Sequence, residues 1–139
     1  MIIVVDASVV VKWLVQDAER EADTDKAQRL MEAVVKGEQP VSQPCHWICE
    51  VAAVLSRTSP DTAADDAAML CALELPLTDE PAVLPRACEL AIELKQHVFD
   101  TYYHAVALES PDAVLVTADE RYLRAGRVKG RIIHLRDWR

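Results

Sequence analysis

The sequence opens with MIIVVDAS at residues 1–8, a run of five apolar residues that ends at an acid, Asp6. The pattern recurs in AVLVTAD at residues 113–119, which ends at Asp119. A continuous apolar run with a polar boundary is typical of a strand buried on both faces. Ligands of open α/β sheets bind beyond the carboxyl ends of such strands. We therefore expect both acids at a binding edge of a sheet.

The rest of the chain alternates strand and helix patterns. At 139 residues it has the length of one domain, spanning 1–139, and only three glycines interrupt an Ala-rich composition, which favours helix. This alternation predicts a three-layer α/β/α domain with a mostly parallel central sheet. The expected strands are 2–5, a short one at Val41, 75–77, 113–116 and 131–135. The expected helices are 8–15, 19–36, 45–57, 60–73 with Ser59 as cap, one opened by Thr78 or Asp79, 100–109 with Asp100 as cap, and 119–126 with Asp119 as cap.

Bulk properties exclude several classes of protein. No apolar stretch has the length that a membrane span needs, and the start is too short for a signal peptide, so we expect a cytoplasmic protein without membrane contact. The net charge of −8 argues against non-specific coating of nucleic acid. The four cysteines are expected to be reduced and buried, because their spacing completes no zinc motif even with His46 and Glu50 one helical turn apart.

Two further acids join Asp6 and Asp119 as candidates for a metal site. Glu50 lies on the flank of its helix, off the apolar stripe, and Asp100 leads a segment that carries no charge before Glu109. Four convergent carboxylates cannot all stay ionised unless a cation holds them. A plainer interpretation stays open for each acid, as a helix cap for Asp6, Asp100 and Asp119 and as a solvent-exposed side chain for Glu50.

Other polar residues are weaker candidates. Thr117 places a hydroxyl towards the same rim as Asp119, and His104 is expected to be a core residue. Trp13, Trp47 and Trp138 are expected in the core or at a partner interface. Four basic side chains are candidates to contact substrate phosphates, although each alone is more often a solvated charge: Lys12, Arg57, Arg121 and Arg124.

The chain resembles the PIN-domain family, and specifically the VapC-type toxin ribonucleases of type II toxin–antitoxin systems. The resemblance rests on four segments that cover nearly the whole chain in the right order: VDAS at 5–8, WICEV at 47–51, FDTYYHAVA at 99–107 and LVTADER at 115–121. Each segment is short, so the set is specific rather than any single one.

The resemblance implies an acidic quartet that binds Mg²⁺ or Mn²⁺, formed by Asp6, Glu50, Asp100 and Asp119. In this family pattern, Asp6 and Asp100 are the direct metal ligands, and Thr117 and Ser8 are supporting hydroxyls. It further implies cleavage of RNA, a homodimer, and inhibition by a cognate antitoxin protein whose C-terminal segment lies over the active-site groove. The expected chemistry is metal-assisted hydrolysis of a phosphodiester.

Two other functions remain open on the sequence alone. A non-catalytic PIN-like module could bind RNA or a partner without cutting, although clustered acids have no purpose in an inert scaffold. A phosphoryl-transfer or receiver-type domain also places an Asp after a buried strand. It would need a second Asp at position 8 or a Lys in the last strand, and this chain has Ser8 and no such Lys.

Overall fold

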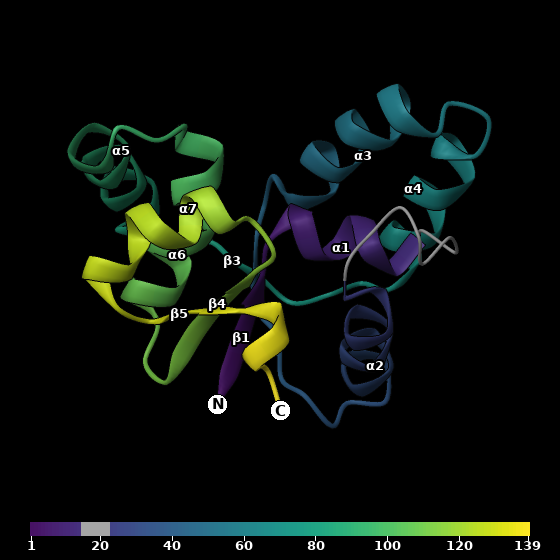
Figure 1. Ribbon diagram of the computed structural model, residues 1–139, viewed down its shortest axis with the longest axis horizontal. Coiled ribbons are helices and arrows are strands. Elements are labelled where there is room, and N and C mark those ends of the chain that lie inside the picture. The colour runs from purple at the N-terminus through teal and green to yellow at the C-terminus, as the bar shows by residue number, and fades with distance from the viewer. Residues whose placement is uncertain (15–22) are drawn as a thin grey trace.

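The computed structural model describes residues 1–14 and 23–139, and its centre is a parallel sheet (Figure 1). The sheet contains β1 (Ile2–Val5), β4 (Ala113–Thr117) and β5 (Ile132–His134) in the order β1-β4-β5, with Val5 opposite Val116. All of β4 is buried, as expected for a parallel strand covered on both faces. The three corresponding strand predictions are confirmed, with small shifts at their ends.

A second, two-stranded sheet lies next to β1. Strands β2 (Gln43–Pro44) and β3 (Leu77–Thr78) pair in parallel, and Val41 forms a single bridge to Ile3. Two residues after Val41, the buried side chain of Gln43 takes the place of a neighbouring strand and pairs with the backbone of Val5. Its Oε1 accepts a hydrogen bond from Val5 N at 2.7 Å, and its Nε2 donates to Val5 O at 2.9 Å. One amide side chain thus satisfies both polar groups of the last β1 residue.

Helices cover both faces of the sheet, which confirms the predicted α/β/α class. In Figure 1, α5, α6 and α7 lie above and to the left of the strands, and α1 to α4 lie to the right of β1. Helix α6 packs against β1, β4 and α5, while α1 packs against β4, α2 and α3. The helices are α1 (Ala7–Leu14), α2 (Thr24–Val35), α3 (Trp47–Thr58), α4 (Ala63–Ala72), α5 (Val83–Leu94), α6 (Val98–Glu109) and α7 (Glu120–Gly126), with the 3₁₀ helices η1 (Arg127–Lys129) and η2 (Leu135–Asp137).

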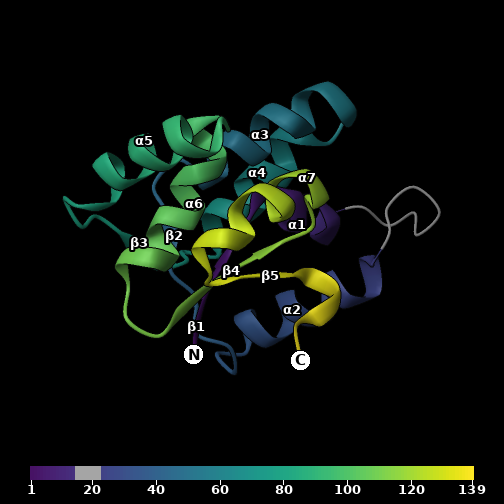
Figure 2. The ribbon, with the colours of Figure 1, turned by 60° about the vertical axis from the view of Figure 1, so that its left-hand side comes forward.

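The C-terminus is held against α2 (Figure 2). Trp138 Nε1 donates to Gln39 Oε1 at 3.2 Å, and the Lys26 ammonium lies 6.0 Å from the centroid of the Trp138 ring. Trp13 and Trp47 are buried in the core, as predicted for these aromatic residues. Within the described residues, no helix is long and apolar enough to cross a membrane.

Three predicted helix starts are wrong. Ser59 does not open α4. Its amide donates to Leu55 O at 2.7 Å, so Ser59 ends α3 and α4 begins three residues after Pro60. Thr78 does not cap α5, because it belongs to β3, and α5 begins only at Val83.

The third error concerns Asp100, which is inside α6 and not its cap. The cap is His97, whose Nδ1 accepts a hydrogen bond from Phe99 N at 3.1 Å. Asp119, by contrast, caps α7 as predicted and accepts a hydrogen bond from Tyr122 N at 3.0 Å. Residue Val15 and the first residues of the predicted helix 19–36 lie outside the described part of the chain.

Candidate metal centre

The four acids singled out from the sequence line one pocket of about 350 Å³. Asp6 follows β1 and Asp119 follows β4 by two residues, and since these strands are paired neighbours their ends meet at one edge of the sheet. Glu50 and Asp100 enter from the first turns of α3 and α6. We call this the acidic pocket. Its remaining lining residues are Ala7, Ser8, Val11, Lys12, Val54 and Ala118.

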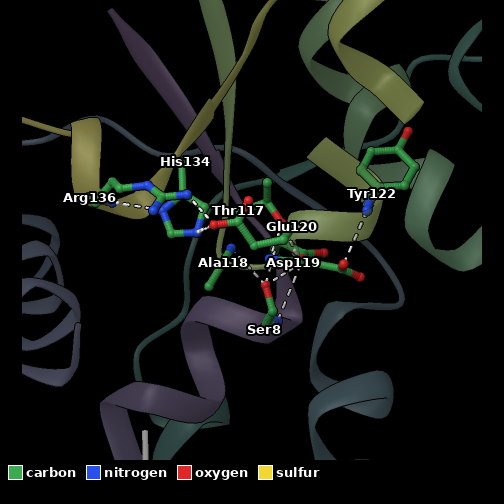
Figure 3. Close-up of polar contacts among 9 residues, drawn as sticks. Ser8, Thr117, Ala118, Asp119, Glu120, Tyr122, His134 and Arg136 are labelled. Atoms are coloured by element: carbon green, nitrogen blue, oxygen red, sulfur yellow. Dashed lines mark hydrogen bonds and ion pairs between the residues drawn. The ribbon is translucent and has the colours of Figure 1, made fainter. Parts of the chain in front are cut away.

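A network of hydroxyl groups fixes Asp6 in place, and Figure 3 shows Ser8 and Thr117 beside Ala118 and Asp119. Ser8 Oγ and Thr117 Oγ1 both donate to Asp6 Oδ2, the latter at 3.0 Å. Each hydroxyl is in turn held by the backbone of the neighbouring loop, since Ala118 N donates to Ser8 Oγ and Asp119 N to Thr117 Oγ1, both at 3.0 Å. The carboxylate of Asp6 is therefore oriented before any ligand arrives.

Burial and mutual repulsion make it costly to ionise the carboxyl groups of the acidic pocket. Burial is the main cause that raises the pKa of Asp6 to about 7, and the carboxylates of Glu50 and Asp100 add to it, while the Ser8 hydroxyl opposes it. The pKa of Asp100 is also raised, by its own partial burial first and then by Glu50 and Asp119. A cation bound among these groups would favour their charged forms and remove this cost.

Glu50 has a neighbour that the sequence reasoning considered only as a zinc ligand. His46, one turn earlier on the chain, places Nε2 at 2.9 Å from Phe99 O and at 3.1 Å from Glu50 Oε2. The hydrogen bond goes to the carbonyl, so the buried Glu50 Oε2 has no hydrogen-bond partner within residues 1–14 and 23–139. A buried carboxylate oxygen without a partner is unfavourable, and a bound cation would offset that cost.

Tyr103 is a second residue of the site that sequence reasoning missed. Its side chain is fully buried, and its hydroxyl lacks a hydrogen-bond partner in the described part of the chain. Burial raises the pKa of this phenol, with further contributions from the nearby carboxylates of Glu50 and Asp6. The phenol therefore stays protonated and available as a donor behind the acids. Its position in an uncharged segment gave no sign of this role.

The donor set suits a hard divalent cation. The described residues contain no group of three His, Cys, Asp or Glu side chains arranged to hold one ion directly. Mg²⁺ does not require such a cage, because it keeps several waters and takes one or two carboxylates from the protein. The acidic pocket offers carboxylates and hydroxyls and has room for water. These residues fit Mg²⁺ or Mn²⁺.

The remaining candidates divide between the site and the rest of the fold. Lys12 lines the acidic pocket, Arg57 lines the pocket beside it, and Arg121 and Arg124 are exposed on α7 and line neither. His104 is a core residue as predicted, with Nδ1 at 3.0 Å from Tyr122 Oη and Nε2 at 2.8 Å from Gly130 O. The cysteines are free as expected, but the prediction that they are buried is wrong, because all four are exposed.

Comparison with known proteins agrees with the fold. The family model for the PIN domain matches residues 3–128. The crystal structure of PAE2754 from Pyrobaculum aerophilum is similar, with a TM-score of 0.64 and 21% sequence identity over 96% of this chain and 89% of that chain. No curated protein matches. The receiver-type alternative gains no support from these matches. Since the family model spans most of the sequence, the chain belongs to the PIN domain family.

Proposed function

We propose that this protein is a metal-dependent endoribonuclease and the toxin of a type II toxin–antitoxin pair. PIN domains are usually nucleases that use divalent metals and bind RNA. The observation that carries the proposal is the gathering of Asp6, Glu50, Asp100 and Asp119 around one pocket. Asp6 is the most informative of the four, because it is buried, negatively charged only at a cost, and held by two hydroxyls.

The proposed cofactor is Mg²⁺, with Mn²⁺ as a substitute of similar preference for oxygen ligands. Asp6 and Asp100 would bind it directly, and Glu50 and Asp119 would hold its water ligands. When bound, such an ion activates water for attack on a phosphodiester and stabilises the charge that develops on the phosphoryl oxygens.

The chain's own residues position these groups. Ser8 and Thr117 hold the same oxygen of Asp6, so the carboxylate cannot rotate freely when substrate or ion enters. The two backbone amides that anchor these hydroxyls belong to Ala118 and Asp119, which links the rim of β4 to the rim of β1. Lys12, which also lines the pocket, is a cationic group that can contact a substrate phosphate there.

The proposed partners are RNA, a cognate antitoxin and a second copy of the chain. A strongly negative pocket favours an antitoxin segment that inserts a basic side chain among the acids. A homodimer is supported by α5, where Leu84, Cys88 and Ile92 are exposed one turn apart, with exposures of 51% for Leu84 and 80% for Ile92. We place this toxin in the cytoplasm.

The test is cleavage of single-stranded RNA by purified protein in Mg²⁺, with EDTA as the metal-free control. Asp6→Asn and Asp100→Asn should each abolish cleavage while leaving the protein folded. Asp65→Asn, which removes an exposed acid from α4, is the matched control and should cleave as the wild type does. Cleavage by the double variant Asp6→Asn/Asp100→Asn would refute the assignment. RNA binding without cleavage by the wild type would instead identify a non-catalytic binding module.

A further inference from the structure

A second pocket, of about 420 Å³, opens beside the acidic pocket. The two share Glu50, Val54 and Asp100 in their linings, so they are neighbouring parts of one surface. The second pocket, called here the side pocket, differs in chemistry. The residues particular to it are aromatic, apolar or cationic: His46, Cys49, Ala53, Arg57, His97 and Phe99.

Phe99 is the most unusual residue of the side pocket. It is the only phenylalanine in the sequence, yet its exposed fraction is 52%. A single exposed apolar side chain is common on protein surfaces and alone would need no explanation. Phe99, however, directly precedes Asp100 and lines a pocket that is continuous with the acids. Its position makes it part of the candidate site.

Two imidazole rings, those of His97 and His46, contact Phe99. His97 Nδ1 accepts a hydrogen bond from Phe99 N, and the two rings contact edge to face with centroids 4.8 Å apart. His46 Nε2 donates to Phe99 O at 2.9 Å, with ring centroids 5.5 Å apart. The backbone and the ring are thus fixed, so little conformational entropy remains to be lost when a ligand packs on the exposed part of the ring.

We propose that the side pocket binds one nucleobase of the RNA, stacked on Phe99, next to the nucleotide whose phosphate lies in the acidic pocket. This inference rests on the proposed ribonuclease function. A flat aromatic surface beside a phosphate-handling site is the arrangement that proteins use for bases of single strands, and every base can stack on it. Arg57 on the same lining is a suitable contact for the next phosphate along the strand.

The experiment compares two probes of equal length: a fluorescein-labelled ten-nucleotide oligoadenylate and an abasic ribose–phosphate decamer. Their binding is measured by fluorescence anisotropy in Mg²⁺ with Asp6→Asn protein, which is expected not to cleave either probe. Stacking contributes about 1–3 kcal/mol per base, so Phe99→Ala should reduce the preference for oligoadenylate about 5- to 150-fold. Phe99→Trp should keep the preference, because it keeps the flat ring.

Two controls separate base stacking from other effects. Leu77→Ala removes an apolar side chain of similar exposure, 57%, from β3 and should leave the preference unchanged. Arg57→Gln should lower the affinity for both probes by a similar factor, as expected for a phosphate contact. Thermal unfolding of every variant shows whether it is folded, and the Phe99→Trp result holds even if Phe99→Ala loses stability.

The outcomes distinguish the inference from the function on which it rests. If the wild-type protein cleaves RNA but Phe99→Ala keeps the full preference for oligoadenylate, the base subsite is wrong and the ribonuclease function stands. The base subsite is also wrong if Phe99→Ala lowers the affinity for both probes equally. That result is expected if the pocket binds a peptide and the substitution disturbs RNA binding only indirectly. If the wild type neither binds nor cleaves RNA, the proposed function itself fails.

Discussion

Replacing Asp6 by Asn should stabilise the metal-free protein, and the gain should depend on pH in a defined way. The pKa of Asp6 lies at about 7 in the folded protein, against an ordinary value of 3.8, mainly because the carboxylate is buried. The folded state therefore keeps a proton on Asp6 between pH 4 and 7, where the unfolded chain has lost it. Stability of the wild type falls with rising pH through this window and levels off above pH 7.

The size of the effect follows from the two pKa values. A difference from 3.8 to about 7 at 1.36 kcal/mol per pH unit amounts to about 4 kcal/mol of lost stability above pH 7. Asn is close in shape to the protonated acid and can still accept from Ser8 and Thr117. The variant has no charge to bury. The free energy of unfolding of Asp6→Asn should exceed that of the wild type only slightly near pH 4, and by about 4 kcal/mol at pH 8.

The assay is urea unfolding in EDTA at a series of pH values from 4 to 8, with Asp65→Asn as a control for the change in net charge. Adding saturating Mg²⁺ at pH 8 should reduce the difference in free energy of unfolding between Asp6→Asn and the wild type. An ion that binds only the folded wild type stabilises it by mass action. A gap between Asp6→Asn and wild type that does not change with pH in EDTA would refute the reasoning about the buried carboxylate.

Three further predictions test separate parts of the structure. Thr117→Val leaves Asp119 N without its acceptor and should cost about 1–3 kcal/mol in urea unfolding, whereas Thr117→Ser should cost much less; equal losses would contradict the hydroxyl's role. Gln43→Leu leaves both polar groups of Val5 unpaired and should cost about 2–6 kcal/mol, and an unchanged melting temperature would count against it. Ile92→Glu should convert a dimer to monomer in sedimentation equilibrium if α5 forms the interface; a dimer that persists rules out that face.

The acidic pocket could be predicted in part from the sequence, because the acids at its strand ends follow a general rule. Asp6 directly follows an apolar run and Asp119 comes shortly after another, and parallel strands that are neighbours end at the same edge. Apart from the family resemblance, the only signals for Glu50 and Asp100 were a position on the flank of a helix and a place at the start of an uncharged segment. Their convergence depends on how α3 and α6 pack, which no local pattern determines.

Errors arose where a local signal competed with a tertiary one. Ser59 and Pro60 are a strong helix start in isolation, but the Ser59 amide completes the last turn of α3, so α4 starts later. Asp100 looked like a cap, yet the imidazole of His97 takes that position and moves the acid into the helix. Nothing in the sequence showed that Tyr103 lies beside Glu50 and Asp6, because these residues come from segments far apart in the chain. His46 lies one helical turn before Glu50, and this spacing was considered only as a zinc motif.

The most direct test of the account is anomalous diffraction from crystals soaked in Mn²⁺. We expect a manganese peak in the acidic pocket, at about 2.0–2.2 Å from carboxylate oxygens of Asp6 and Asp100, and its loss in Asp6→Asn crystals. Asp65→Asn crystals should keep the peak. A pocket without manganese in a wild-type protein that cleaves RNA, or a peak that survives Asp6→Asn unchanged, would contradict the claim that these acids form the metal centre.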